Sequence, residues 1–168
     1  MMKIADSDLA GAELFLVRTF DAPRALVWEA WTDTEHLKRW MGPRDYPASV
    51  YEADFRVGGK WRACLQSTEG GADLWQGGVY REIVPHERIV FTFVWDEPHP
   101  AHSHNMLVTV TLADKGGKTE LTFRQQFLPS TAERDGHAYG WGRSFDRLEE
   151  YLAASDSTTT GGNSYEVP

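Results

Sequence analysis

Three of the chain's six histidines, His99, His102 and His104, stand close together and could form a metal site. His102 and His104 project to the same side if they lie in a strand, and two such imidazoles can bind Zn²⁺, with His99 or a neighbouring carboxylate completing a tetrahedron. Pro98 and Pro100, however, mark the segment as a turn between two strands, and no cysteine lies nearby. We therefore predict no metal and no cofactor, and we keep the three histidines as weak metal candidates at the rim of a cavity.

A second group of polar side chains could catalyse proton transfer if strands and helices turned them inward. It comprises Glu52, Asp54, Arg56, Arg62, Tyr80, Arg124, Gln125, His137 and Arg143. A buried carboxylate, or His137 with a shifted pKa, would be able to move a proton. Yet no nucleophile has a recognisable base beside it, and Ser144 in the motif GWGRS falls within a helical stripe, not on a strand-to-helix turn. We predict no catalytic residue, and an enzyme of the cyclase or hydrolase kind is the third hypothesis for function.

Most of these residues fall in segments where apolar and polar side chains alternate, which is typical of antiparallel strands. The expected strands cover residues 13–20, 48–56, 60–67, 74–84, 88–96, 104–114 and 118–127. Glycine pairs at 58–59 and 116–117 predict two-residue hairpin turns, because glycine adopts the positive φ of those turns without steric cost. An antiparallel sheet of about seven strands is therefore expected.

Helical patterns occur in three places. The sequence Asp21-Ala-Pro predicts the start of a first short helix, and Thr34 predicts the start of a second. Ser130 and Glu133 fit a capping box at the start of a long helix. Apolar residues then recur at helical spacing as far as position 154.

One domain over residues 13–154 accounts for these elements. Residues 1–12 are an N-terminal extension, and residues 155–168, which lack apolar periodicity, are predicted to be a flexible C-terminal tail. An antiparallel sheet with one solvent-exposed face must bury its other, apolar face against another element. Only the long helix is large enough to bury it. The predicted fold class is α+β, in which the sheet grips the long C-terminal helix and two short helices follow the first strand.

Composition excludes several functional classes. The formal net charge is −8, with 17 Lys and Arg against 25 Asp and Glu, so we expect no nucleic-acid partner and no anionic membrane surface. No segment approaches the roughly 20 apolar residues of a membrane span. The single cysteine, Cys64, cannot form an internal disulfide, and no signal-like segment stands at the N-terminus, so we expect a cytoplasmic protein.

Five segments are similar to those of one bacterial family. They are FDAPRALVWEAWTD from Phe20, HLKRWMGP from His36, RVGGKW from Arg56, GVYREIVPHERIVFT from Gly78 and DGHAYGWGRSFDRL from Asp135. Over residues 13–154 the chain closely resembles bacterial proteins similar to the C-terminal domain of the heat-shock-protein-90 ATPase activator, in the START-like superfamily. The resemblance implies the helix-grip fold of the birch-pollen allergen, in which a curved sheet grips the C-terminal helix.

This superfamily includes lipid carriers, polyketide cyclases and hormone receptors, so the fold does not select one role. The resemblance, together with the many aromatic residues, implies a cavity that holds a small apolar or aromatic molecule between the sheet and the helix. The predicted ligand-binding residues are Trp40, Trp61, Phe91, Phe93, Trp95, Leu121, Phe123, Gln125, Trp141 and Phe145. Gly136, Gly140 and Gly142 support a cavity, because three glycines in one helix suggest a loosened segment, a kink or close approach to another backbone. A chaperone-associated interaction module is the second hypothesis, and we expect a monomer or homodimer.

Overall fold

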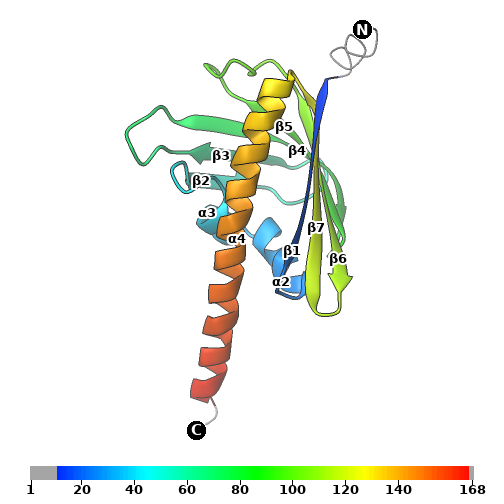
Figure 1. The fold of residues 1–168 in the computed structure, drawn as a ribbon, viewed down its shortest axis with the longest axis vertical. Coiled ribbons are helices and arrows are strands. Elements are labelled where there is room, and N and C mark those ends of the chain that lie inside the picture. The colour runs from blue at the N-terminus through cyan, green and yellow to red at the C-terminus, as the bar shows by residue number, and fades with distance from the viewer. Residues whose placement is uncertain (1–10, 167–168) are drawn as a thin grey trace.

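Seven strands and three helices make up the computed structural model, which describes residues 11–166 and, of the side chains, those as far as Ser155. The strands are β1 (Ala12–Phe20), β2 (Ala48–Ala53), β3 (Lys60–Leu65), β4 (Leu74–Val84), β5 (Arg88–Trp95), β6 (Met106–Lys115) and β7 (Lys118–Leu128). The helices are α2 (Arg24–Thr32), α3 (Thr34–Trp40) and α4 (Thr131–Glu166). This is the α+β helix-grip fold that the sequence predicts (Figure 1).

The strands form one antiparallel sheet in the order β1-β7-β6-β5-β4-β3-β2. The first strand pairs with the last, and the others follow as a meander in which neighbours in sequence are neighbours in space. On β6 the buried residues Met106, Val108, Val110 and Leu112 alternate with partly exposed ones. This alternation gives the sheet one apolar face that must be covered.

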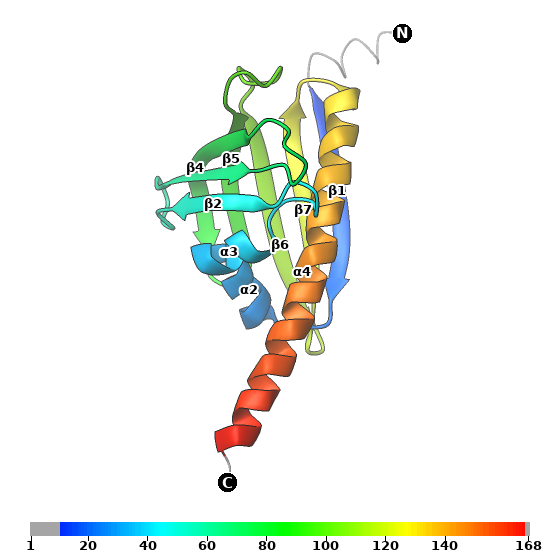
Figure 2. The same cartoon turned by 90° about the vertical axis from the view of Figure 1, so that its left-hand side faces the viewer.

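Helix α4 crosses the apolar face, and α2 and α3 lie on the same side of the sheet (Figures 1 and 2). Aromatic rings fill the space between the layers, where the ring centroid of Phe123 on β7 lies 4.5 Å from that of Trp141 and 5.6 Å from that of Phe145. Arg18 of the edge strand β1 donates a hydrogen bond of 2.9 Å to Asp146 of α4. The sheet therefore holds the helix through its core and at its edge.

The hairpin between β6 and β7 has the predicted two-residue turn. Gly116 and Gly117 have φ values of 68° and 90°, and Lys115 pairs directly with Lys118. Two successive positive φ values are what a type I′ turn requires, which explains the glycine pair.

The glycine pair at 58–59 lies in the predicted hairpin, since β2 and β3 pair antiparallel, but it does not form a two-residue turn. Gly58 and Gly59 instead end a longer loop over residues 54–59, and the Gly58 N–H donates to the Tyr80 carbonyl of β4 at 2.8 Å. A Cβ on Gly59 would lie 1.9 Å from the Asp54 carbonyl oxygen. Gly59 is therefore required by the close approach of two backbone segments, whereas Gly58 has a φ of 86° and no atom within 4 Å of a Cβ position.

The short helices occupy their predicted places but begin with different caps. The N-cap of α2 is Pro23, which makes no side-chain hydrogen bond, so Asp21 does not cap this helix. The N-cap of α3 is Asp33, whose carboxylate accepts from the Glu35 N–H at 2.9 Å. The predicted cap, Thr34, is already the first helical residue.

The long helix begins with the serine half of the predicted capping box, because the Ser130 hydroxyl accepts from the Glu133 N–H at 3.1 Å. It continues beyond Ala154 to Glu166 and so covers most of the segment predicted as a tail, whose flexibility stays a prediction. The N-terminal extension predicted for residues 1–12 lies outside the described residues except for its last two positions.

Candidate functional site

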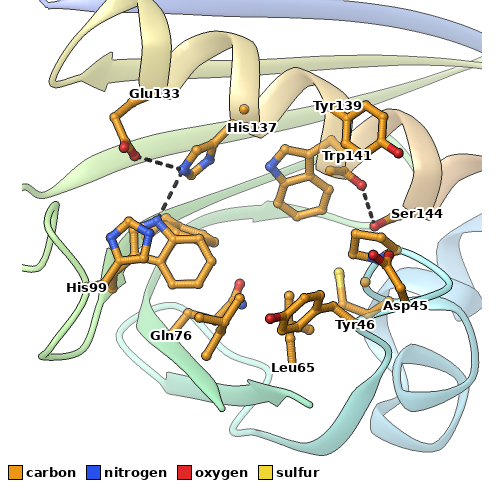
Figure 3. Close-up of a pocket in the computed structure, with 18 of the residues that line it drawn as sticks. Asp45, Tyr46, Leu65, Gln76, His99, Glu133, His137, Tyr139, Trp141 and Ser144 are labelled. Atoms are coloured by element: carbon orange, nitrogen blue, oxygen red, sulfur yellow. Dashed lines mark hydrogen bonds and ion pairs between the residues drawn. The ribbon is translucent and has the colours of Figure 1, made fainter. Parts of the chain in front are cut away.

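A cavity of about 360 Å³ opens between the first half of α4 and the adjoining ends of β3, β4 and β5 (Figure 3). Its apolar lining includes Met41, Leu65, Leu74, Phe93, Trp95 and Trp141, and the ring of Tyr46 also lines it. Small-molecule pockets typically have volumes of about 300–1,000 Å³ and mostly apolar linings. The cavity is therefore of a size and character that suit a small aromatic molecule.

The register of the sheet builds the floor of this cavity. Leu65 of β3 is the direct partner of Leu74 of β4, and Gln76 of β4 is the direct partner of Trp95 of β5. Direct partners stand side by side on one face of a sheet, and residues two apart on a strand share a face. These four residues therefore form one surface, although they come from three strands.

The segment after α3 closes another side of the cavity. Gly42 has a φ of 90°, and a Cβ at this position would lie 2.3 Å from the Tyr46 carbonyl oxygen. The Arg147 guanidinium of α4 donates to the carbonyls of Arg39, Met41 and Gly42 at 2.9, 3.0 and 2.8 Å. These bonds satisfy carbonyls at the C-terminal end of α3 and hold the segment against α4.

Two glycines leave the helix side of the cavity open. Gly136 and Gly140 both line the cavity, and a Cβ added to either would meet no atom within 4 Å. Gly142 also faces open space but does not line the cavity. None of the three glycines is required by close approach to another backbone, which corrects one of the explanations predicted from the sequence.

A chain of hydrogen bonds along the helix side determines the tautomer of His137. The Trp95 indole N–H donates to Nε2 of His137 at 3.1 Å, and Nδ1–H of the same ring donates to Oε1 of Gln125 at 3.1 Å. The Trp141 indole N–H donates to the same Gln125 oxygen at 3.1 Å. Because an indole N–H can only donate, Nε2 must be the unprotonated nitrogen.

Burial keeps His137 neutral. Its exposed fraction is 8%, and desolvation, reinforced by the nearby His99, lowers its pKa from 6.5 to about 4. Glu133 lies 3.9 Å from Nε2. The imidazole could accept a proton only by giving up its hydrogen bond from Trp95, so it supports the cavity wall and is a poor base near neutral pH.

Gln76 brings an unpaired polar group to the cavity. The residue is 4% exposed, and its Nε2 has no hydrogen-bond partner among the described residues. Figure 3 shows the amide end of the side chain pointing into the cavity. A buried donor without an acceptor costs about 1–3 kcal/mol, so this N–H is an unusual feature of the floor.

The charged side chains of the lining are acidic. Asp45 and Glu133 line the cavity, and none of the described lining residues is Lys or Arg. Arg143 lines an adjoining surface depression, where it pairs with Asp146 at 3.2 Å. The electrostatic environment therefore disfavours an anion inside the cavity.

The ten predicted ligand-binding residues divide between the cavity and the packed core. Phe93, Trp95 and Trp141 line the cavity, and Gln125 contributes only through its hydrogen bonds to His137 and Trp141. The other six lie in the core and not in the cavity lining: Trp40, Trp61, Phe91, Leu121, Phe123 and Phe145. A role of these six in ligand binding stays a prediction.

Sequence reasoning missed several lining residues. Leu65, Leu74 and Gln76 carried no signal beyond their place in segments predicted to be strands. Gly136 and Gly140 were the one available signal, because glycine weakens a helix and needs a reason to be there. The reason is the open space on the cavity side of α4.

The three clustered histidines are not assembled into a metal site. His99 lines the cavity and stacks on Trp95 with 4.4 Å between ring centroids. Nδ1 of His102 lies 2.8 Å from the His99 carbonyl oxygen, and His104 is exposed. Within the described residues, no group of three or more His, Cys, Asp or Glu side chains is placed to hold a metal ion.

The polar residues considered for catalysis are also dispersed. Of that set, all within the described residues, His137 is the one that lines the cavity. Arg56, for example, forms an exposed ion pair of 2.7 Å with Asp54. Ser144 lines the cavity, but its hydroxyl donates to a carbonyl one helical turn earlier at 2.9 Å. The lining therefore presents a binding surface more clearly than a catalytic one.

Comparison with known families agrees with this architecture. The family model described as "Activator of Hsp90 ATPase homolog 1-like protein" matches residues 21–153. The chain belongs to this family. Membership confirms the resemblance found in the sequence and supports a ligand-binding domain or a domain like the activator of the Hsp90 ATPase.

Solved structures of bacterial proteins share the fold. A protein from Chromobacterium violaceum is 30% identical with a TM-score of 0.76, over 83% of this chain and 96% of that chain. A protein from Nitrosomonas europaea is 26% identical with a TM-score of 0.73, over 86% and 96%. A protein of the same activator family from Silicibacter pomeroyi, 22% identical with a TM-score of 0.77 over 86% and 99%, supports the fold alone.

The comparison with curated proteins finds no match. Among the described residues, no helix combines the length and the apolar character that crossing a membrane would need. The hypotheses of a chaperone-associated module, of an enzyme and of a cytoplasmic location stay predictions.

Proposed function

We propose that this family member binds a small apolar or aromatic molecule in the cavity between the sheet and α4. The observation that carries the proposal is an apolar cavity of about 360 Å³ whose helix side is kept free by Gly136 and Gly140. Protein interiors are close-packed, and an unfilled apolar space reduces stability. Glycines that weaken a helix and also preserve such a space make sense if another molecule fills it.

The mouth of the cavity supports the same proposal. Asp45 and Tyr139 line both the cavity and the adjoining surface depression, so the apolar interior connects to solvent at this point. Tyr139 is 64% exposed. We propose that a small molecule enters the cavity past these two side chains, without opening of the sheet.

Uptake of the neutral dye N-phenyl-1-naphthylamine tests the proposal. Its fluorescence should rise saturably with the native protein. Replacing Gly140 with leucine puts a side chain into the cavity, and since overpacking costs about 1–3 kcal/mol we expect dye affinity to fall by about tenfold or more. Leucine also favours the helix by nearly 1 kcal/mol over glycine, so the variant should remain folded.

The matched control is Gly142→Leu, which makes the same change in the same helix at a position outside the cavity. Its dye affinity should stay within about twofold of the native value, because the cavity is untouched. If the native protein shows no saturable uptake, or if both variants lose uptake equally, the binding proposal is wrong.

A further inference from the structure

We propose that the cavity takes an uncharged, planar aromatic molecule that carries a carbonyl oxygen, and that the Nε2–H of Gln76 donates to this oxygen. The inference rests on the proposed binding function and adds two things to it. One is the chemical class of the ligand. The other is the residue, Gln76, that would make the protein bind a carbonyl compound more tightly than a hydrocarbon of the same shape.

The unpaired amide of Gln76 is the first reason. Nε2 is buried, finds no acceptor among the described residues, and belongs to a side chain that points into the cavity (Figure 3). Buried polar groups in proteins nearly always have a hydrogen-bond partner. An acceptor on a bound molecule would supply the missing partner.

Three other N–H groups around the cavity are already engaged. The indole of Trp95 donates to His137, the indole of Trp141 donates to Gln125, and Nδ1–H of His137 donates to the same glutamine. A ligand acceptor directed at any of these would have to break an existing bond. Gln76 offers its hydrogen without such a loss.

Charge restricts the acceptor to an uncharged group. Asp45 and Glu133 are the charged side chains among the described lining residues, and no Lys or Arg joins them. His137 is buried and its Nε2 already accepts a hydrogen bond from Trp95, so it adds no positive charge. A carboxylate or phosphate would lose its hydration without gaining a cation, whereas a ketone, quinone or lactone oxygen would not.

The aromatic walls favour a flat molecule. Figure 3 shows Trp141 and Tyr46 on opposite sides of the cavity, with Gln76 beside the space between them. Aromatic rings pack well against flat partners, and a carbonyl conjugated to a ring keeps its lone pairs in the ring plane. A ring held between these walls could direct such an oxygen toward Gln76 on the floor, beside the space between them.

Three probes of similar shape test the inference by displacement of N-phenyl-1-naphthylamine. 2-Acetylnaphthalene carries the carbonyl, 2-isopropenylnaphthalene replaces the oxygen with a methylene group, and 2-naphthoate carries a negative charge. The native protein should bind the anion at least about tenfold more weakly than the ketone at neutral pH, because the anion is desolvated beside acidic side chains.

The decisive comparison uses Gln76→Met, which keeps the length of the side chain and removes the donor. The affinity ratio of ketone to alkene should fall by about fivefold relative to the native protein, which corresponds to one hydrogen bond. The control Leu65→Met alters the apolar floor without altering a donor, so the ratio should stay as in the native protein.

The outcomes separate this inference from the proposed function. If the dye binds and Gly140→Leu excludes it, but the ketone-to-alkene ratio is the same in the native protein and in Gln76→Met, binding stands and the role of Gln76 is refuted. Tighter binding of 2-naphthoate than of the ketone would refute the uncharged ligand class. If the native protein takes up no dye, both proposals fall.

Discussion

The buried imidazole of His137 makes the stability of this protein depend on pH. The pKa is 6.5 for an ordinary histidine and about 4 in the folded protein. Between these values the unfolded chain binds a proton that the folded chain does not, so the free energy of unfolding falls as the pH falls. The contribution is complete above about pH 6.5 and is lost by about pH 4.

The magnitude follows from the difference between the two pKa values. Each pKa unit corresponds to about 1.4 kcal/mol, so the change from 6.5 to about 4 amounts to about 3 kcal/mol. The structural cause is burial of the imidazole, reinforced by the nearby His99, and Nε2 already accepts a hydrogen bond from the Trp95 indole. A proton on Nε2 would face that donor, and Glu133 at 3.9 Å is too far for a strong compensating hydrogen bond.

Urea unfolding, followed by tryptophan fluorescence at a series of pH values, measures this effect. Carboxylates titrate in the same range, so the native protein must be compared with His137→Gln. Glutamine does not titrate, and its Oε1 can still accept a hydrogen bond from an indole. The native protein should lose about 3 kcal/mol more than the variant between about pH 6.5 and about pH 4.

Equal pH dependence in the two proteins would refute the reasoning, because His137 would then titrate alike in the folded and unfolded states. A nuclear magnetic resonance titration gives an independent check on the same residue. An imidazole midpoint near 6.5 in the folded protein would show that burial and the bond from Trp95 do not hold the ring neutral.

Two further substitutions test how the cavity is built. Gly42→Ala should lower the free energy of unfolding by at least about 2 kcal/mol and weaken dye uptake. The reason is that the position has positive φ and a Cβ would meet the Tyr46 carbonyl oxygen at 2.3 Å. Unchanged urea unfolding and unchanged dye uptake would contradict this account of the turn. Phe145→Ala should cost about 3–5 kcal/mol in urea unfolding, because the ring is 1% exposed and packed in the core. A loss below about 1 kcal/mol would instead mean that Phe145 faces free space.

Features that depend on neighbours in sequence were predictable. The turn at Gly116 and Gly117 and the cap of α4 by Ser130 each involve residues a few positions apart, and both occur as expected. Apolar residues recur at every second position in strands and at every third or fourth position in helices. The order of strands and helices followed from where the spacing changes. Family resemblance added the helix-grip arrangement, which the sheet order and the matched family model confirm.

The lining of the cavity was much harder to predict. Phe145 and Trp141 both belong to the apolar stripe of α4, yet Trp141 lines the cavity and Phe145 lies in the core. Both side chains are large and aromatic, and both are needed to cover the sheet. Their different surroundings depend on where along the sheet the helix crosses. The spacing of apolar residues within the helix does not determine that position.

By itself, the sequence determined the elements, their order and the apolar side of each, because short-range periodicity and turn chemistry act within a few residues. Only the tertiary structure decided which residues line the cavity between the sheet and α4. Gln76 lies beside Trp95 because the two are direct partners in neighbouring strands. Gly140 of α4 lines the same cavity from the helix side. That a buried glutamine N–H lacks a partner is a property of all the atoms around it, and no sequence pattern contains it.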